Sequence, residues 1–327
     1  MTGSGKYIAP AGKEAVLPPQ RYLTRDPPAH QQLKIDQKTF PVQTGKAIIG
    51  TVILESKSND QTIIGDRFAS LKSIIYASAQ HVGSQGLLLF PAGWYYSGEA
   101  PASSLYDRIS HEIGDVLAET GCNYQICVGV DGLSEQTPIG KFSRDQISVA
   151  CDKNGITGLA RKFYPSNEEK GHVNLAAGPS SEENGYSRVV KSQGKQFFMS
   201  VCFDIAATYK LRGFTNPGVD GILNLVHCFY PRGMGPSGSA YFARHKFAGA
   251  SKEWHCPVYG AATFFVNSMP ERWPSGVIWN QGTLATPDWN YGMNPYAPLS
   301  SIRVPLDEGH ATIRYFEYPT PSEERVQ

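Results

Sequence analysis

Several strand-length segments of this chain are apolar at nearly every position, instead of at every second one. The clearest are residues 86–90, 197–203 and 221–226. A strand of this kind is covered on both faces, because a face exposed to water would carry polar residues at alternate positions. Segments 65–82 and 105–120 instead carry apolar residues at helical spacing and lie between such strands. The pattern therefore predicts a layered α/β fold.

Strands outnumber helices in the second half of the chain, which argues against a simple doubly wound sheet. Further strands are expected at 47–54, 123–130, 147–151, 156–163, 258–266, 276–278, 301–306 and 312–318, and a further helix at 239–252. No Gly-x-Gly-x-x-Gly opens a helix after the first strand, so a dinucleotide-dependent enzyme is disfavoured.

The net charge of the chain and the spacing of its cysteines limit which ligands, metals and macromolecules it is expected to bind. A net charge of +1 gives no field that would attract nucleic acid or an anionic membrane, so a small or weakly charged ligand is expected. The six cysteines include no Cys-x-x-Cys pair and no zinc spacing, so we expect no metal and no cofactor. No run reaches membrane-spanning length and the first thirty residues lack a signal-peptide core, so a cytoplasmic location with reduced thiols is expected.

Composition divides the chain into three parts. Residues 1–43 hold six prolines and few periodic apolar positions, and are expected to form an extended arm. Residues 44–318 form the expected α/β domain, and residues 319–327 form a short C-terminal tail.

Cys202 ends one of the buried strands, in the sequence Phe-Phe-Met-Ser-Val-Cys-Phe-Asp from 197 to 204. On this segment alone, a buried structural cysteine is the simpler interpretation, because free cysteine is among the most buried residue types. A cysteine at the end of a strand can also be presented to a substrate as a nucleophile. The choice depends on the other strand ends.

Three strand ends occur in a recognisable order. They read Leu-Leu-Leu-Phe-Pro-Ala-Gly-Trp at 87–94, Leu-Ala-Arg-Lys-Phe at 159–163 and Ser-Val-Cys-Phe-Asp at 200–204. In this order the chain resembles the carbon–nitrogen hydrolase superfamily of nitrilases and amidases, whose strands end in Phe-Pro-Glu, Arg-Lys and Cys-x-Asp or Cys-x-Glu. The likeness continues through Gly-Val-Asp-Gly-Ile-Leu-Asn-Leu at 218–225 and Ser-Gly-Val-Ile at 275–278, so that it covers about residues 44–318.

The resemblance implies an αββα four-layer sandwich and a hydrolase of amide or nitrile carbon–nitrogen bonds outside peptides. Cys202 matches the nucleophile, which forms a covalent acyl- or thioimidate-enzyme. Lys162 matches the cation that stabilises the negative charge developing on the attacked group. The resemblance also implies a homodimer or a larger homo-oligomer, with a small amide or nitrile as substrate.

Ala92 departs from the family pattern, because it occupies the position of the expected catalytic Glu. A methyl group cannot accept a proton, and losing a general base costs about 10²–10⁴-fold in rate. Either the base has been removed and the enzyme is an inactive form, or the chain is a catalytically silent relative that binds a ligand or acts as an assembly scaffold, or another residue supplies the base. The candidates for that residue are His227, which follows the predicted strand 221–226, and Glu99, in the expected loop 95–99.

Other residues fall near the same strand ends. Five aromatic residues are candidates for a substrate pocket by position, namely Trp94, Tyr95, Phe203, Phe229 and Tyr230. Asp204 is expected to order the loop after Cys202 without reacting. A supporting Glu is expected after Lys162, and Glu168, Glu169, Glu182 and Glu183 compete for that role. The glycine-rich segment 232–238 is expected to form a loop over the site or a subunit contact.

Overall fold

The computed structural model describes residues 48–57, 67–135, 144–229, 242–265, 273–278 and 298–318. All of these residues belong to the unit formed by residues 33–327. The predicted arm at 1–43, the tail at 319–327 and the glycine-rich segment 232–238 lie outside the described residues. The three-part division of the chain therefore stays a prediction.

The elements follow the predicted alternation of strands and helices. The helices are α1 (Arg67–Val82), α2 (Ala102–Thr120), the 3-10 helix η2 (Cys202–Ala206), α3 (Ala207–Lys210), the π-helix η3 (Ala243–Phe247) and α5 (Ala248–Trp254). The strands are β1 (Ile48–Ser56), β2 (Gln85–Leu89), β3 (Tyr95–Pro101), β4 (Asn123–Leu133), β5 (Arg144–Asp152), β6 (Gly155–Arg161), β7 (Val173–Asn174), β8 (Val189–Ser192), β9 (Lys195–Val201), β10 (Gly221–Phe229), β11 (Val258–Phe265), β12 (Gly276–Val277), β13 (Ser300–Leu306) and β14 (Gly309–Glu317).

The described strands form one continuous hydrogen-bonded sheet, with the order β6-β5-β4-β2-β1-β11-β10-β9-β8 along its main path. Between β4 and β9, every two neighbouring strands on that path are parallel to each other. The carboxyl ends of these six strands therefore meet at one edge. That edge carries Cys202 after β9, His227 near the end of β10, Ala92 after β2 and Asp131 near the end of β4.

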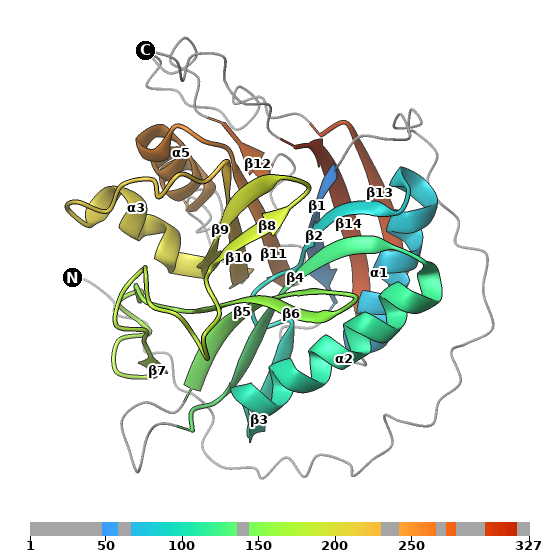
Figure 1. Ribbon diagram of the computed structural model, residues 1–327, viewed down its shortest axis with the longest axis horizontal. Coiled ribbons are helices and arrows are strands. Elements are labelled where there is room, and N and C mark those ends of the chain that lie inside the picture. Colours follow the sequence, from blue (N-terminus) through green and yellow to red (C-terminus); the bar gives the residue numbers. More distant parts are fainter. Residues whose placement is uncertain are drawn as a thin grey trace. The chain divides into compact units, whose positions relative to one another are not determined.

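Three apolar clusters separate four layers. One cluster lies between α1 and α2 and the outer face of β1, β2, β4 and β5. A second lies between β9, β10 and β11 and the helices α3 and α5. The third joins the inner faces of the two halves of the sheet, with Leu87 and Cys127 on one side and Phe197 and Leu223 on the other. Helix, sheet, sheet and helix thus follow one another, as Figure 1 shows with α1 and α2 opposite α3 and α5. This confirms the predicted α/β fold with αββα layers.

The alternation inside β9 explains why its sequence is apolar throughout. Phe197 and Met199 point into the cluster between the sheets, whereas Phe198 points toward Trp254 of α5. Both faces are dry, so both sets of positions are apolar.

Two local predictions were wrong. The segment from Tyr95 to Glu99 was expected to be a loop, but it belongs to β3, whose first residues pair with Val130 and Asp131 of β4. The pairing of Tyr95 and Tyr96 with a distant strand decides this, and the register shifts before Pro101, where the Ser97 hydroxyl accepts the backbone N–H groups of Glu99 and Ala100. The second error concerns β9, which was predicted to run to residue 203 but ends at Val201, so that Cys202 is the first residue of η2.

Candidate active site

Cys202 is the first residue of η2 and adopts a φ of +50°. This left-handed backbone conformation is uncommon for a residue with a side chain, and such residues cluster at functional sites. The Asn224 side chain holds the turn by donating from Nδ2 to the carbonyl oxygen of Cys202, at 3.0 Å. The half-buried thiol is thus presented at a sharp turn from a buried strand into a helix.

Asp204 ties this turn to the strand end that carries Lys162. Its Oδ1 accepts hydrogen bonds from the backbone N–H groups of Phe163 and Tyr164, at 3.0 and 2.7 Å, and its Oδ2 accepts one from Val201, at 3.2 Å. Burial raises the pKa of Asp204 to about 6, against the opposing influence of Lys162 and Arg188. Through these three hydrogen bonds Asp204 links the turn after β9 to the backbone that follows Lys162.

Lys162 is fully buried immediately after β6, and its ammonium is paired. Its Nζ donates to Glu169 Oε1 at 2.6 Å, while the second oxygen of Glu169 accepts the backbone N–H of Ser166, at 2.8 Å. Burial opposes the charge on Lys162, but Cys202, Glu169 and Asp204 outweigh it and raise the pKa of the amine. Lys162 therefore carries a fixed positive charge beside the thiol.

Glu169 is the partner of Lys162 among the four acidic residues that competed for this role. Glu183 instead binds the neighbouring Arg161, whose guanidinium also pairs with Asp145. Arg161 and Lys162 are adjacent in sequence but point to separate acidic groups. Arg161 is held by ion pairs with Asp145 and Glu183, whereas Lys162 is held by Glu169 near Cys202.

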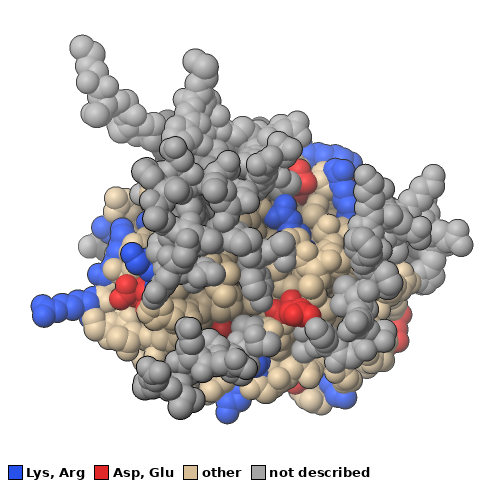
Figure 2. Space-filling model, turned by 90° about the horizontal axis from the view of Figure 1, so that it is seen from above, with Lys and Arg blue, Asp and Glu red and all other residues tan. Residues whose placement is uncertain are grey.

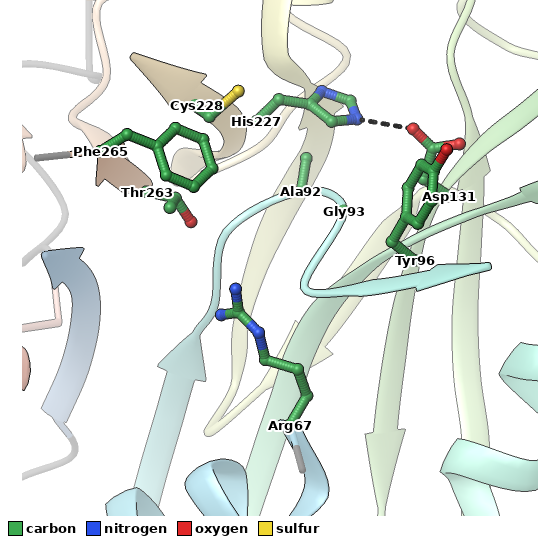
Figure 3. Close-up of a pocket in the computed structure, with 9 residues that line it drawn as sticks. All are labelled: Arg67, Ala92, Gly93, Tyr96, Asp131, His227, Cys228, Thr263 and Phe265. Atoms are coloured by element: carbon green, nitrogen blue, oxygen red, sulfur yellow. Dashed lines mark ion pairs between the residues drawn. The ribbon is translucent and has the colours of Figure 1, made fainter. Parts of the chain in front are cut away.

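His227 lies within β10, two residues before the strand ends, and not beyond a strand ending at 226 as predicted. Its Nε2 lies 3.6 Å from Asp131 Oδ2, and Figure 3 shows the imidazole and the carboxylate pointing toward each other. Among the described residues, neither ring nitrogen has a hydrogen-bond partner. Burial disfavours the imidazolium, but Asp131 and Cys202 outweigh it and raise the pKa of His227 to about 9.

Asp131 is a buried carboxylate held from several sides. Arg144 donates from Nε to Asp131 Oδ1 at 2.5 Å and from Nη2 to the backbone oxygen of Asp131 at 2.8 Å. Gln146 reaches Oδ2 at 3.4 Å. Burial alone would raise the pKa of Asp131, yet His227 and Arg144 hold it below its usual value. The carboxylate is therefore ionised and fixed beside the imidazole.

The charges around Cys202 favour ionisation of its thiol. Burial favours the neutral thiol, but Lys162 and His227 outweigh it and lower the pKa of Cys202. Two cations that favour the thiolate are the usual environment of a reactive cysteine. A buried structural cysteine would show the opposite shift, as Cys151 does, whose thiol pKa burial raises.

Ala92 lines a small pocket together with His227 and Asp131, whereas Cys202 and Lys162 are not among the lining residues. The pocket is lined by Ala92, Gly93, Asp131, His227, Thr263 and Arg67 among others, and Figure 3 shows Ala92 between His227 and Arg67. The backbone of Ala92 is fixed there, since its N–H donates to Val226 O at 3.1 Å. Figure 3 shows the methyl group of Ala92 directed toward the side of the pocket that holds His227.

The other predicted residues have varied positions. Glu99 is exposed on β3 and does not line the pocket. Trp94 and Tyr95 pack in the cluster beneath α1 and α2, and of the three aromatic residues at 94–96, all of which could wall a pocket by position, Tyr96 lines it. Phe203 stacks on Tyr164, and Phe229 packs on Phe264 and Trp273, so both belong to the cluster around α5. Tyr230 lies outside the described residues.

Asp131 and Arg67 were not predicted from the sequence. Asp131 lies beyond the predicted end of its strand, in Val-Gly-Val-Asp-Gly-Leu, and Arg67 lies two residues after the predicted start of its helix. A charged residue at the end of an apolar strand was the available signal for Asp131. Nothing in the sequence indicated that Arg67 is buried.

The described residues contain no group of three side chains that could hold a metal ion. Among the described helices, none is long and apolar enough to cross a membrane. In the part of the surface that Figure 2 leaves uncovered, basic and acidic side chains are interspersed.

No protein-family model matches the chain, and no curated protein matches it. Among solved structures, it is similar to a mutant of the Nesterenkonia AN1 amidase from the nitrilase superfamily, with 15% identity, 68% of this chain and 78% of that chain covered, and a TM-score of 0.48. A second mutant of that amidase, with the acetamide moiety of fluoroacetamide added covalently at the active-site cysteine, gives 13% identity, 85% and 93% coverage and a TM-score of 0.49. A crystal structure of an amidase from Nesterenkonia sp. is 12% identical in sequence and has a TM-score of 0.47. The match covers 84% of this chain and 92% of that chain.

Proposed function

We propose that this protein hydrolyses amide or nitrile carbon–nitrogen bonds through a covalent intermediate on Cys202. The observation that carries the proposal is the environment of the thiol, in which Lys162 and His227 together overcome burial and lower its pKa. The order of the three strand ends in the sequence supports the same chemistry. We further propose that His227, positioned by Asp131, replaces the Glu that Ala92 lacks.

The first half-reaction starts from a thiolate and an imidazolium, because the pKa of His227 is about 9. The Cys202 thiolate attacks the amide carbon, and the carbonyl π electrons move onto oxygen. The ammonium of Lys162 stabilises this oxyanion. As the carbon–nitrogen bond breaks, the His227 imidazolium gives its proton to the leaving nitrogen, which departs as ammonia or an amine. Cys202 is left as a thioester and His227 as a neutral imidazole.

The second half-reaction uses the neutral imidazole as the base. His227 takes a proton from water, and the oxygen attacks the thioester carbon. The tetrahedral intermediate collapses by expelling the Cys202 thiolate, which releases a carboxylic acid and restores the starting ion pair. In sum, one amide and one water give one acid and one amine, so that atoms and charge balance.

Asp131 is the carboxylate that positions the base in an arrangement of nucleophile, base and carboxylate. It stays ionised, faces Nε2 of His227 and stabilises the imidazolium. Glu169 holds Lys162 in the same way, so each of the two cations beside Cys202 has its own buried or half-buried carboxylate.

The test is intact-protein and peptide mass spectrometry after incubation with a panel of small amides and nitriles. We expect an acyl or thioimidate adduct on Cys202 and release of ammonia. Cys202→Ala should abolish both, whereas Cys256→Ala, at a buried cysteine outside the site, should retain them. The absence of any adduct on Cys202 across the panel, with no ammonia, would refute the proposal.

The second candidate function is a catalytically silent protein that uses the same pocket for binding or assembly. Ala92 favours it, because the base expected at that position is absent. Ligand binding without turnover, unchanged by His227→Ala, would support this alternative. Turnover that is lost specifically in Cys202→Ala would exclude it. Homo-oligomerisation and a cytoplasmic location also remain predictions.

A further inference from the structure

Arg188 is a buried arginine that the proposed reaction does not use. It lies immediately before β8, and its side chain is only 3% exposed. Its guanidinium carbon lies 4.5 Å from the centre of the Phe163 ring and 5.4 Å from the centre of the Phe198 ring. Burying a guanidinium is costly unless charges and hydrogen bonds compensate it, so the polar contacts of Arg188 bear on its role.

The polar contacts of Arg188 reach both segments of the candidate active site. Nη2 donates to the backbone oxygen of Arg161, at 2.8 Å, and Nη1 lies 3.9 Å from Oδ2 of the fully buried Asp204. Arg161 directly precedes Lys162, and Asp204 follows Cys202 by two residues. Among the described residues, Nε and Nη1 have no hydrogen-bond partner although both are buried. The contacts that compensate the buried cation are therefore the two that join these segments.

The backbone on both sides of Lys162 is fixed by the pair of Arg188 and Asp204. The carbonyl oxygen that precedes Lys162 accepts from Arg188, and the N–H group that follows it donates to Asp204 Oδ1, at 3.0 Å. Asp204 Oδ2, the oxygen that faces Arg188, accepts the N–H of Val201, at 3.2 Å, directly before Cys202. The pair thus contacts the chain beside the nucleophile and beside the cation.

The charge on Asp204 depends on its cationic neighbours. Burial raises the pKa of Asp204 to about 6, and Lys162 and Arg188 oppose that increase. Because this value is only slightly below neutral pH, losing one of the two cations would leave the carboxyl protonated at pH 7. Its hydrogen bonds to backbone N–H groups are charge-assisted and would weaken. Glu183 is the other acidic group whose charge acts on Arg188.

We propose that Arg188 is a positioning residue of the active site, which binds the carbonyl oxygen of Arg161, faces the Asp204 carboxylate and so holds Lys162 and Cys202 in place for the reaction. This inference rests on the proposed hydrolase function. Arg188 acts through Asp204 and the backbone and not on the substrate. Its loss should therefore lower kcat and leave KM nearly unchanged.

The variants Arg188→Lys and Arg188→Gln separate the two contacts, because Lys keeps the positive charge and Gln keeps only a neutral donor. Two quantities are measured against pH. One is the rate at which iodoacetamide alkylates Cys202, followed by peptide mass spectrometry, and the other is kcat for an amide that the parent hydrolyses.

We expect Arg188→Gln to move the acid limb of both profiles up by about 1–3 units, the effect of one neighbouring charge. At pH 7 its kcat should fall by about 10- to 100-fold. Arg188→Lys should keep the acid limb of the parent. Arg212→Gln, at an exposed arginine, should change neither profile.

A second comparison tests whether Arg188 acts through Asp204. In Asp204→Asn no carboxyl titrates at this position, so adding Arg188→Gln should not move the acid limb further. The double variant also leaves no pair with one member missing, so it serves if thermal melts show that Arg188→Gln alone does not fold. A further shift in the double variant, relative to Asp204→Asn, would overturn the inference.

The outcomes separate this inference from the proposed function. Parent-like profiles in a folded Arg188→Gln, or equal shifts in Arg188→Gln and Arg188→Lys, would overturn the role of Arg188 even if amides acylate Cys202. If no amide acylates Cys202 but the alkylation profile still shifts in Arg188→Gln alone, the hydrolase proposal fails and the positioning of the thiol by Arg188 stands.

Discussion

His227 Nε2 lies 3.6 Å from Asp131 Oδ2, across the carboxyl ends of two strands that are nearly a hundred residues apart in the chain. This relationship gives the site a half-buried imidazole whose pKa is raised to about 9, beside a thiol whose pKa is lowered. A proton donor and acceptor is therefore present at a site whose Phe-Pro-Ala strand end lacks the expected carboxylate.

The pH dependence of kcat/KM should be bell-shaped. The active form holds a thiolate and an imidazolium, so activity should fall at low pH as Cys202 is protonated and at high pH as His227 loses its proton near pH 9. The two titrations are coupled, so the observed values belong to the pair. Asp131→Asn removes the charge that raises the pKa of His227, and should move the alkaline limb down by about 1–3 units. The exposed Asp107→Asn should not move it.

His227→Ala should lower the rate by about 10²–10⁴-fold, because it removes the proposed acid and base. In that background Ala92→Glu should restore part of the activity, since it returns a carboxylate to the position that the family resemblance indicates. Single-turnover release of ammonia measures both variants. If His227→Ala retains full activity, His227 is not the base.

Glu169→Gln should lower kcat more than it raises KM, because Lys162 loses the charge that positions it for the developing oxyanion. We expect a loss of about 10²–10³-fold, comparable to removal of an oxyanion donor. Glu168→Gln is the matched control, since the neighbouring side chain is exposed and should leave the kinetics unchanged. Equal effects in the two variants would show that the ion pair with Glu169 has no part in catalysis.

Asp204→Ala should destabilise the fold and remove reactivity together. It leaves two buried backbone N–H groups, those of Val201 and Phe163, and the partly buried one of Tyr164 without their acceptor. At about 1–3 kcal/mol for each unsatisfied donor, we expect a loss of about 3 kcal/mol or more in the free energy of unfolding. Denaturant titration measures this loss, and Asp204→Asn, which keeps an acceptor oxygen, should lose less.

Gly129→Ala should be strongly destabilising, because a Cβ at that position would lie 2.2 Å from Ala92 Cα. Backbone cannot yield as a flexible side chain can, so we expect a loss of about 3 kcal/mol in stability and a displaced Ala92. Gly114→Ala in α2 is the contrasting case, with its nearest contact at 3.6 Å, and should be neutral or stabilising by about 0.5–1 kcal/mol. Similar melting temperatures for the two variants would contradict this account.

The main elements of the fold could be predicted because the determining signals are local. Strands such as 197–203 are apolar on both faces, and helices such as 105–120 have one apolar face, so layers on both sides of the sheet follow from the sequence. The errors fall where distant pairing decides. Tyr95 and Tyr96 form a strand only because the end of β4 lies beside them.

The sequence by itself determined that Cys202 and Lys162 end two of three ordered strands and that Ala92 occupies the end of the other. Only the tertiary structure decided that Glu169 and not Glu183 meets Lys162, that Asp131 faces His227 and that Arg67 points into the pocket. The physical reason is that charged side chains at strand ends find their partners through strand order and register. Those relations join residues far apart in the chain and leave no local pattern in it.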